Sequence, residues 1–225
     1  MFEMIWALFQ ACFSREHFLE LIQWQYPKTS REYRLIEDAY DVAEMEFREM
    51  VRLTGDPYMS HLRTTTVFLF VAMYFHSAFS AELLAAALLH DLFEDFPHRW
   101  SEGDFVDRFG LSTFLYVLDV TKPRLSSYDY DKYLRNRAYR VMVSSIGFWS
   151  FMLKICDNGQ NLLTLWAMPL WKQERVIQLA LTFYHPLAQK NKTFPTVYRV
   201  VVAYAQVRFA LCVAKNWATK VRCEG

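Results

Sequence analysis

Apolar residues recur along most of the chain at intervals of three and four, which is the spacing of one face of an α-helix. Residues 33–53 show this spacing at Leu35, Ile36, Ala39, Val42, Ala43, Met45 and Phe47. The same pattern predicts helices over residues 58–75, 81–93, 102–109, 111–120, 133–143, 148–166, 171–184 and 195–221. The chain is therefore predicted to be all-α.

The predicted helix over residues 81–93 is apolar on almost every side, which is typical of a helix at the centre of a core. Ser80 precedes it and Ser101 precedes the helix over residues 102–109, and serine at this position caps the first backbone amides. Glycine (6) and proline (7) are sparse, and we find no hairpin signal between alternating strands. These local signals agree with the helical pattern.

Composition limits the class of protein. The chain has 225 residues, 53% of them hydrophobic, which is enough for one domain with at most a small helical annex. The 25 Lys+Arg against 24 Asp+Glu give neither the basic surface of a nucleic-acid binder nor a polybasic membrane signal. The four cysteines are scattered, which argues against a disulfide framework or a structural zinc site and favours free thiols in a reducing compartment.

The two ends of the chain are both apolar. Residues 1–13 lack a positive n-region and a cleavage pattern, so we expect a helix that packs on the domain rather than a signal peptide. The run from Val197 to Ala214 is interrupted by Arg199, Gln206 and Arg208, so we expect that it does not span a bilayer. The expected location is the cytoplasm.

His90 and Asp91 stand side by side at the end of the apolar helix, followed by Glu94 and Asp95. Burying this much polarity is costly unless something compensates for it. An imidazole with a carboxylate suits a divalent metal such as Mn²⁺, Fe²⁺ or Zn²⁺. The alternative is a polar helix end with surface acids, and the pair alone does not decide between them.

Two other polar residues strengthen the metal hypothesis. His61 lies early in the preceding predicted helix, and Asp157 lies inside an otherwise apolar helix, where a carboxylate needs a partner. Asn161 and Thr164 follow Asp157 by four and seven residues, which places all three on one helical face.

Five segments of the chain resemble the hydrolase domain of the RelA/SpoT homologues, the alarmone (p)ppGpp hydrolases of the HD superfamily. Residues 52–61 resemble the family's Arg-x-x-Gly-Glu-Pro-Tyr-x-x-His pattern, and residues 85–95 resemble its Ala-Ala-Leu-Leu-His-Asp core with the following Glu-Asp. Residues 120–122, 154–165 and 183–188 are similar to three further blocks in the family's order. The resemblance implies a single-domain HD-type helical bundle over residues 34–195, with an N-terminal helical extension (1–33) and a C-terminal helix packing on the same domain (196–225).

The resemblance also implies roles for the matched residues. His61, His90, Asp91 and Asp157 would hold one metal ion, usually Mn²⁺ in this family, although another divalent metal would suit the same ligands. Glu94 and Asp95 would orient or deprotonate the attacking water. The nucleotide would be bound by Arg52, Lys122, Asn161, Thr164 and Tyr184.

For some of these residues an ordinary structural role is the alternative. Arg52 could be a solvated helix end, Lys122 a loop lysine, Tyr184 a core residue and Glu94 a structural acid. Four positions also depart from the family pattern: Leu53 and Gln160 replace Lys and His, Asn158 replaces Arg, and Leu62 replaces Pro. Three of these changes remove basic or potentially basic groups near the expected nucleotide, so they bear on the substrate rather than on the metal.

The leading functional hypothesis is metal-dependent removal of the 3′-pyrophosphate of (p)ppGpp, the alarmone of the stringent response, giving GDP or GTP and pyrophosphate. One alternative is the same chemistry on another nucleotide, as in an NADPH phosphatase or a dNTP hydrolase. Another is a non-catalytic nucleotide-binding protein. The expected partner is a small nucleotide, without nucleic acid or membrane, and a homo-oligomer is left open.

Overall fold

The structure is a computed structural model that describes residue 8 and residues 11–224, with side chains through residue 216. Most of the helix predicted over residues 1–13 lies outside the described residues. In the described part, the first helices are α2 (Arg15–Gln23), α3 (Arg31–Glu46), α4 (Tyr58–His76), α5 (Ala81–Leu89), α6 (Leu92–Asp95), α7 (Glu102–Phe109), α8 (Leu111–Val120) and α9 (Lys132–Ser145). They are followed by α10 (Phe148–Leu163), α11 (Leu170–Leu179), the π-helical turn η3 (Ala180–Tyr184), α12 (His185–Asn191) and α13 (Pro195–Glu224).

The all-α prediction is confirmed: the described residues form these helices, two short 3₁₀ turns and one isolated β-bridge between Val51 and Pro57. They group into two compact units whose boundary falls inside α10. The first unit comprises Met1–Arg52 and Asp56–Cys156, and the second comprises Leu53–Gly55 and Asp157–Gly225. The division predicted from the sequence at residues 33 and 195 stays a prediction.

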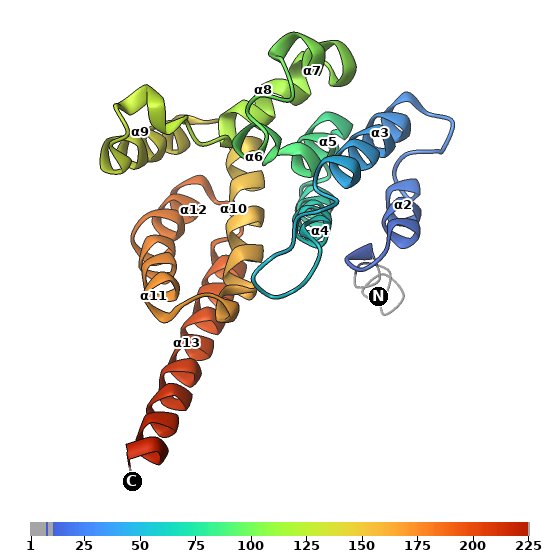
Figure 1. Ribbon diagram of the computed structural model, residues 1–225. Coiled ribbons are helices and arrows are strands. Elements are labelled where there is room, and N and C mark those ends of the chain that lie inside the picture. The colour runs from blue at the N-terminus through green and yellow to red at the C-terminus, as the bar shows by residue number, and fades with distance from the viewer. Residues whose placement is uncertain (1–7, 9–10, 225) are drawn as a thin grey trace. The chain divides into compact units, whose positions relative to one another are not determined.

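Helix α5 is the centre of the first unit and packs on α3, α4 and α8 (Figure 1). Its sequence explains this position, because only Glu82 among its nine residues is not fully apolar, and the other eight are buried. The run Ala85-Ala86-Ala87 lets neighbouring helices approach closely, and α3 presents Ile36, Ala39, Tyr40 and Ala43 as its buried face. The Ser80 hydroxyl accepts a hydrogen bond from the Leu83 amide, so the predicted cap is confirmed.

The structure corrects one boundary in this region. The helix predicted over residues 81–93 ends at Leu89, and the short helix α6 starts at Leu92. Asp91 stands between them with φ −93° and ψ −3°. Periodicity did not reveal the break because Leu92 and Phe93 continue the apolar pattern past His90 and Asp91.

Shortening a side chain in the centre of α5 is expected to destabilise the fold strongly. Leu84 is 0% exposed, so Leu84→Ala should lower the free energy of unfolding by about 2–5 kcal/mol through lost burial and the cavity left behind. Leu115→Ala on α8 is the matched control, because that side chain is 52% exposed. Urea titration measures both, and equal losses would contradict the central place of α5.

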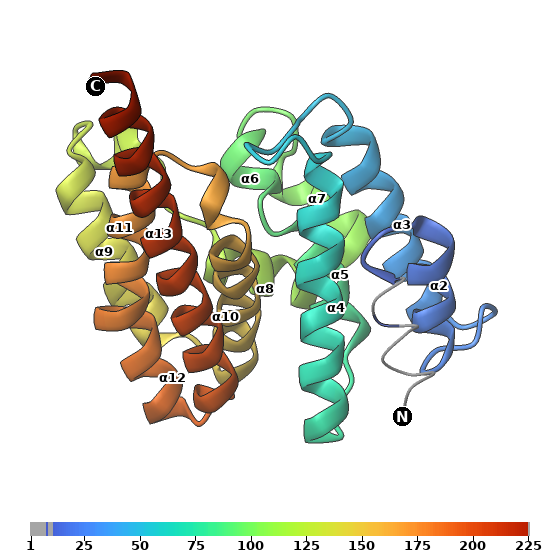
Figure 2. The same cartoon turned by 90° about the horizontal axis from the view of Figure 1, so that it is seen from below.

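In the second unit, α13 packs on α11 and α12 (Figure 2). Tyr198, Val202 and Ala205 form its buried face at intervals of four and three. The segment Pro195–Asn216 of α13 is long and apolar enough to cross a membrane by length and composition, and 17% of its apolar stretch is buried. One such helix is weak evidence for a membrane span, and the expectation that it does not cross a bilayer stays a prediction.

Candidate metal centre

His61 is placed by the start of α4. Pro57 precedes this helix with φ −55° and ψ 142°, an extended conformation that lets the helix begin at Tyr58. His61 follows in the first turn and is 1% exposed, and its ring centroid lies 5.4 Å from that of His90. Two imidazoles are thus buried together at the ends of two different helices.

His90 is held in one tautomer by its own helix. Its Nδ1 lies 2.8 Å from the carbonyl oxygen of Ala87, and a carbonyl can only accept a hydrogen bond. Nδ1 therefore carries the proton in the neutral ring, which leaves the lone pair on Nε2. This arrangement is usual for histidines that bind metal through Nε2.

The Asp91 carboxylate faces both imidazoles. Its Oδ2 atom lies 3.2 Å from His90 Nε2 and 3.5 Å from His61 Nε2. The Tyr58 hydroxyl donates a hydrogen bond of 2.7 Å to the same oxygen. Because the lone pairs of Asp91 Oδ2 and His90 Nε2 face each other, a second proton or a metal ion is needed to make this contact favourable.

Asp157 belongs to the second unit, at the start of its segment Asp157–Gly225, and follows Cys156 directly within α10. One ligand atom from each of His61, His90 and Asp157 lies within 4.8 Å of the others, and all three residues are buried. The Asn161 side-chain amide donates a hydrogen bond of 2.7 Å to Asp157 Oδ1, one helical turn further on. Two nitrogen ligands and one oxygen ligand at this spacing fit a borderline divalent ion.

Glu94 and Asp95 follow in α6 and are both exposed. Glu94 Oε1 accepts a hydrogen bond of 2.5 Å from the Lys122 backbone amide. Although Asp95 is exposed as a residue, its carboxyl group is partly enclosed, and this desolvation, followed by the negative charge of Asp91, raises its pKa, while contact with the Tyr58 hydroxyl opposes the rise. A carboxyl with a raised pKa accepts a proton more readily at neutral pH.

Three curated relatives match most of the chain. A guanosine-3′,5′-bis(diphosphate) 3′-pyrophosphohydrolase of Aquifex aeolicus is 29% identical over 177 residues, which cover 79% of this chain and 24% of the relative. A GTP pyrophosphokinase of Streptomyces coelicolor is 31% identical over 179 residues (78% and 20%). The bifunctional (p)ppGpp synthase/hydrolase SpoT of Escherichia coli is 27% identical over 173 residues (76% and 23%).

This chain is a relative of the RelA/SpoT proteins. The resemblance of its motifs is thereby confirmed, although no protein-family model matches the chain. The chain spans about a fifth to a quarter of the length of these relatives. A solved structure of a metazoan SpoT orthologue that hydrolyses ppGpp has a TM-score of 0.57 and 22% identity, covering 85% of this chain and 98% of that one. It supports the HD-type helical fold.

The residues expected to bind nucleotide in this RelA/SpoT relative make the following contacts. In the first unit, the Arg52 guanidinium lies over the Tyr58 ring at 5.7 Å, and the Lys122 ammonium lies 5.7 Å from the centre of the Tyr139 ring. In the second unit, Thr164 donates a hydrogen bond to the Gln160 carbonyl, and Tyr184 is buried in the π-helical turn. Their roles toward a nucleotide stay predictions.

The departures from the RelA/SpoT pattern have clear structural positions. Asn158 is buried and accepts a hydrogen bond from the Tyr198 hydroxyl, whereas Leu53 is 64% exposed. Leu62 and Gln160 are both buried. Sequence reasoning assigned no role to Tyr58 or Tyr198, although Tyr58 belongs to the first matched block, where its place after Pro57 was the available signal.

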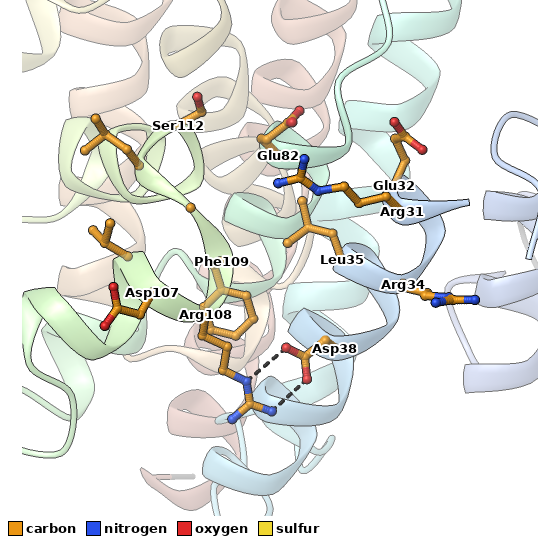
Figure 3. A pocket seen from close by; sticks show the side chains of 13 residues that line it. Arg31, Glu32, Arg34, Leu35, Asp38, Glu82, Asp107, Arg108, Phe109 and Ser112 are labelled. Carbon is orange, nitrogen blue, oxygen red and sulfur yellow. Dashed lines mark hydrogen bonds and ion pairs between the residues drawn. The ribbon is translucent and has the colours of Figure 1, made fainter. Parts of the chain in front are cut away.

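A separate pocket of about 690 Å³ lies in the first unit where α7 and α8 meet the start of α3 (Figure 3). Arg108 closes part of it through a two-pronged ion pair with Asp38, at 2.7 and 2.9 Å. Arginines and acids share its lining, and none of the residues predicted for catalysis, metal or nucleotide lines it. We therefore do not assign the reaction to this pocket.

Proposed function

We propose that this protein is a metal-dependent phosphohydrolase that removes the 3′-pyrophosphate of (p)ppGpp. The observation that carries the proposal is the buried group of His61, His90 and Asp157, with the Asp91 carboxylate in contact with both imidazoles. The names of the curated relatives support (p)ppGpp as the substrate, because the names of the Aquifex aeolicus and Escherichia coli proteins include its hydrolysis. A cytoplasmic location is part of the proposal.

The proposed ligands are His61, His90, Asp91 and Asp157, and the proposed ion is Mn²⁺. The donor set fits a divalent ion because the Ala87 carbonyl fixes the proton of His90 on Nδ1 and leaves Nε2 directed toward Asp91. When bound, a divalent ion would lower the pKa of a coordinated water and make it a nucleophile at neutral pH. The two nitrogens with carboxylate oxygens do not by themselves select Mn²⁺ over Fe²⁺ or Zn²⁺.

The chain's own residues supply the rest of the chemistry. Glu94 and Asp95 orient the attacking water and accept its proton, since both are carboxylates one helical turn after Asp91 and the raised pKa of Asp95 suits a base. Tyr58 holds Asp91 in place through its hydroxyl. Arg52 offers a planar cation for stacking on the purine, and Lys122 offers positive charge to a phosphate beside Glu94.

A second candidate substrate is another nucleotide, such as NADPH or a dNTP. Asn158 supports this alternative, because it stands where the RelA/SpoT pattern has an arginine and its uncharged side chain is buried and hydrogen-bonded to Tyr198. Leu53 stands where the pattern has a lysine, and its side chain is exposed and apolar. Neither residue supplies a cation to the phosphates of a guanosine tetraphosphate.

A nucleotide panel with Mn²⁺ tests the proposal. We expect purified protein to release pyrophosphate from ppGpp and pppGpp, with GDP and GTP as products separated by ion-exchange chromatography. Release of orthophosphate from NADPH, or hydrolysis of a dNTP, would assign the second substrate class instead. Tight binding of ppGpp without turnover of any nucleotide would show a binding protein and refute hydrolysis.

A further inference from the structure

Asn158 is the residue directly after Asp157 in α10, and it is buried. Successive residues of a helix point about 100° apart, so Asn158 faces a different direction from Asp157. Its side-chain oxygen accepts a hydrogen bond from the Tyr198 hydroxyl of α13, forty residues along the chain. The neighbour of a proposed metal ligand is thus tied to another helix of the same unit.

Tyr198 is a rigid partner for this bond. It is 3% exposed and shares the buried face of α13 with Val202 and Ala205. Desolvation, and then the charges of Tyr184 and Asp157, raise the pKa of the Tyr198 hydroxyl. The phenol therefore stays protonated at neutral pH and remains a hydrogen-bond donor to Asn158.

Asp157 is also held from its own helix. The Asn161 amide donates a hydrogen bond of 2.7 Å to Asp157 Oδ1, which restrains the carboxylate itself. That bond does not restrain the helix, because Asn161 turns together with Asp157. Contacts from outside α10 resist rotation about the helix axis: the Ser150 hydroxyl donates to Asp119 near the start of the helix, and the Tyr198–Asn158 bond is such a contact beside Asp157. Functional groups must be held within about 0.5 Å and 10–20° of their working geometry.

We propose that Tyr198 is a positioning residue: through Asn158 it holds the turn of α10 that carries Asp157 and directs the Asp157 carboxylate toward the metal ion. This inference rests on the metal centre of the proposed function. Helix α13 would then contribute to metal binding, although it lies outside the segments that resemble the RelA/SpoT blocks.

The test is the affinity of the full-length protein for Mn²⁺ alone. Tyr198→Phe keeps the buried ring and removes only the hydroxyl. We expect the dissociation constant for Mn²⁺, measured by calorimetry on metal-stripped protein, to rise about tenfold, as for other outer contacts of metal ligands. Tyr204→Phe is the matched control, because it makes the same change on a 43% exposed residue of the same helix and should leave the constant unchanged.

A second variant separates positioning from stability. Tyr198→Phe leaves a buried Asn158 oxygen without its donor, which also lowers the melting temperature. The double variant Tyr198→Phe with Asn158→Leu replaces both polar partners with apolar groups. We expect the melting temperature to recover in the double variant while Mn²⁺ affinity stays weak.

Two results would overturn the inference. One is parental Mn²⁺ affinity in Tyr198→Phe, and the other is affinity that recovers together with the melting temperature in the double variant. If the parent protein binds no Mn²⁺, the proposed metal centre itself is wrong and the inference falls with it. If the parent binds Mn²⁺ but turns over no nucleotide, the affinity comparison still decides the role of Tyr198.

Discussion

Asp157→Ala is expected to abolish Mn²⁺ binding and nucleotide hydrolysis together. The substitution removes the proposed oxygen ligand beside His61 and His90, and the ion is the proposed source of the activated water. We expect Mn²⁺ affinity to fall at least about 100-fold, since loss of a direct ligand should exceed the loss of an outer contact. The value of kcat/KM for ppGpp should fall more than about 1000-fold.

Two further variants make this result specific. Asp157→Asn keeps an oxygen that can accept from Asn161 and removes only the charge, so a well-folded Asp157→Asn protein that fails to bind Mn²⁺ excludes unfolding as the cause. Asp107→Ala is the control, because it removes an exposed carboxylate that lines the separate pocket. It should change neither the Mn²⁺ affinity nor kcat/KM for ppGpp. Full Mn²⁺ affinity in both Asp157 variants would remove this residue from the metal centre.

Glu94→Gln is expected to separate metal binding from catalysis. Glutamine keeps an oxygen that can accept from the Lys122 amide, so the loop should stay anchored, but it cannot take a proton from water. We expect Mn²⁺ affinity to be retained and kcat to fall about 10²- to 10⁴-fold, the usual contribution of a general base. Calorimetry with Mn²⁺ and steady-state kinetics on the same preparation measure the two effects.

Glu102→Gln is the control for this change, because Glu102 is an exposed glutamate in the first turn of α7. It should leave both metal affinity and kcat unchanged. If Glu94→Gln retains full activity, water activation belongs to Asp95 or to another group, and Glu94 acts only as an acceptor for the Lys122 amide.

The helices predicted from the sequence are confirmed where the apolar periodicity ends at the same residues as the helix in the structure. The helix predicted over residues 58–75 appears as Tyr58–His76, and the one over residues 111–120 appears as Leu111–Val120. The prediction was wrong over residues 33–53, because α3 ends at Glu46 and the chain then turns, although Phe47 continues the apolar pattern. The π-helical turn over Ala180–Tyr184 also left no periodic signal.

Residues of the candidate site could be predicted from the sequence where a polar side chain occurs within an apolar helical segment. His90 ends an apolar helix and Asp157 lies inside one, so both stand out in the sequence, whereas His61 was indicated by its place in the first matched block. The structure places one ligand atom of each within 4.8 Å of the others. Tyr58 and Tyr198 could not be found this way, because a tyrosine suits a core equally well without a special role. Their hydroxyl partners lie 33 and 40 residues away in sequence, so only the fold reveals them.

The hydrogen bond from His90 to the Ala87 carbonyl has a consequence for reading related sequences. Ala87 is among the last four residues of α5, whose carbonyls lack partners within the helix, so the imidazole also completes the end of that helix. A histidine at position 90 therefore has a structural role that does not depend on a metal ion. Asp157 lies inside α10 and completes no helix end, so in a related sequence it is the more specific indicator of a metal site.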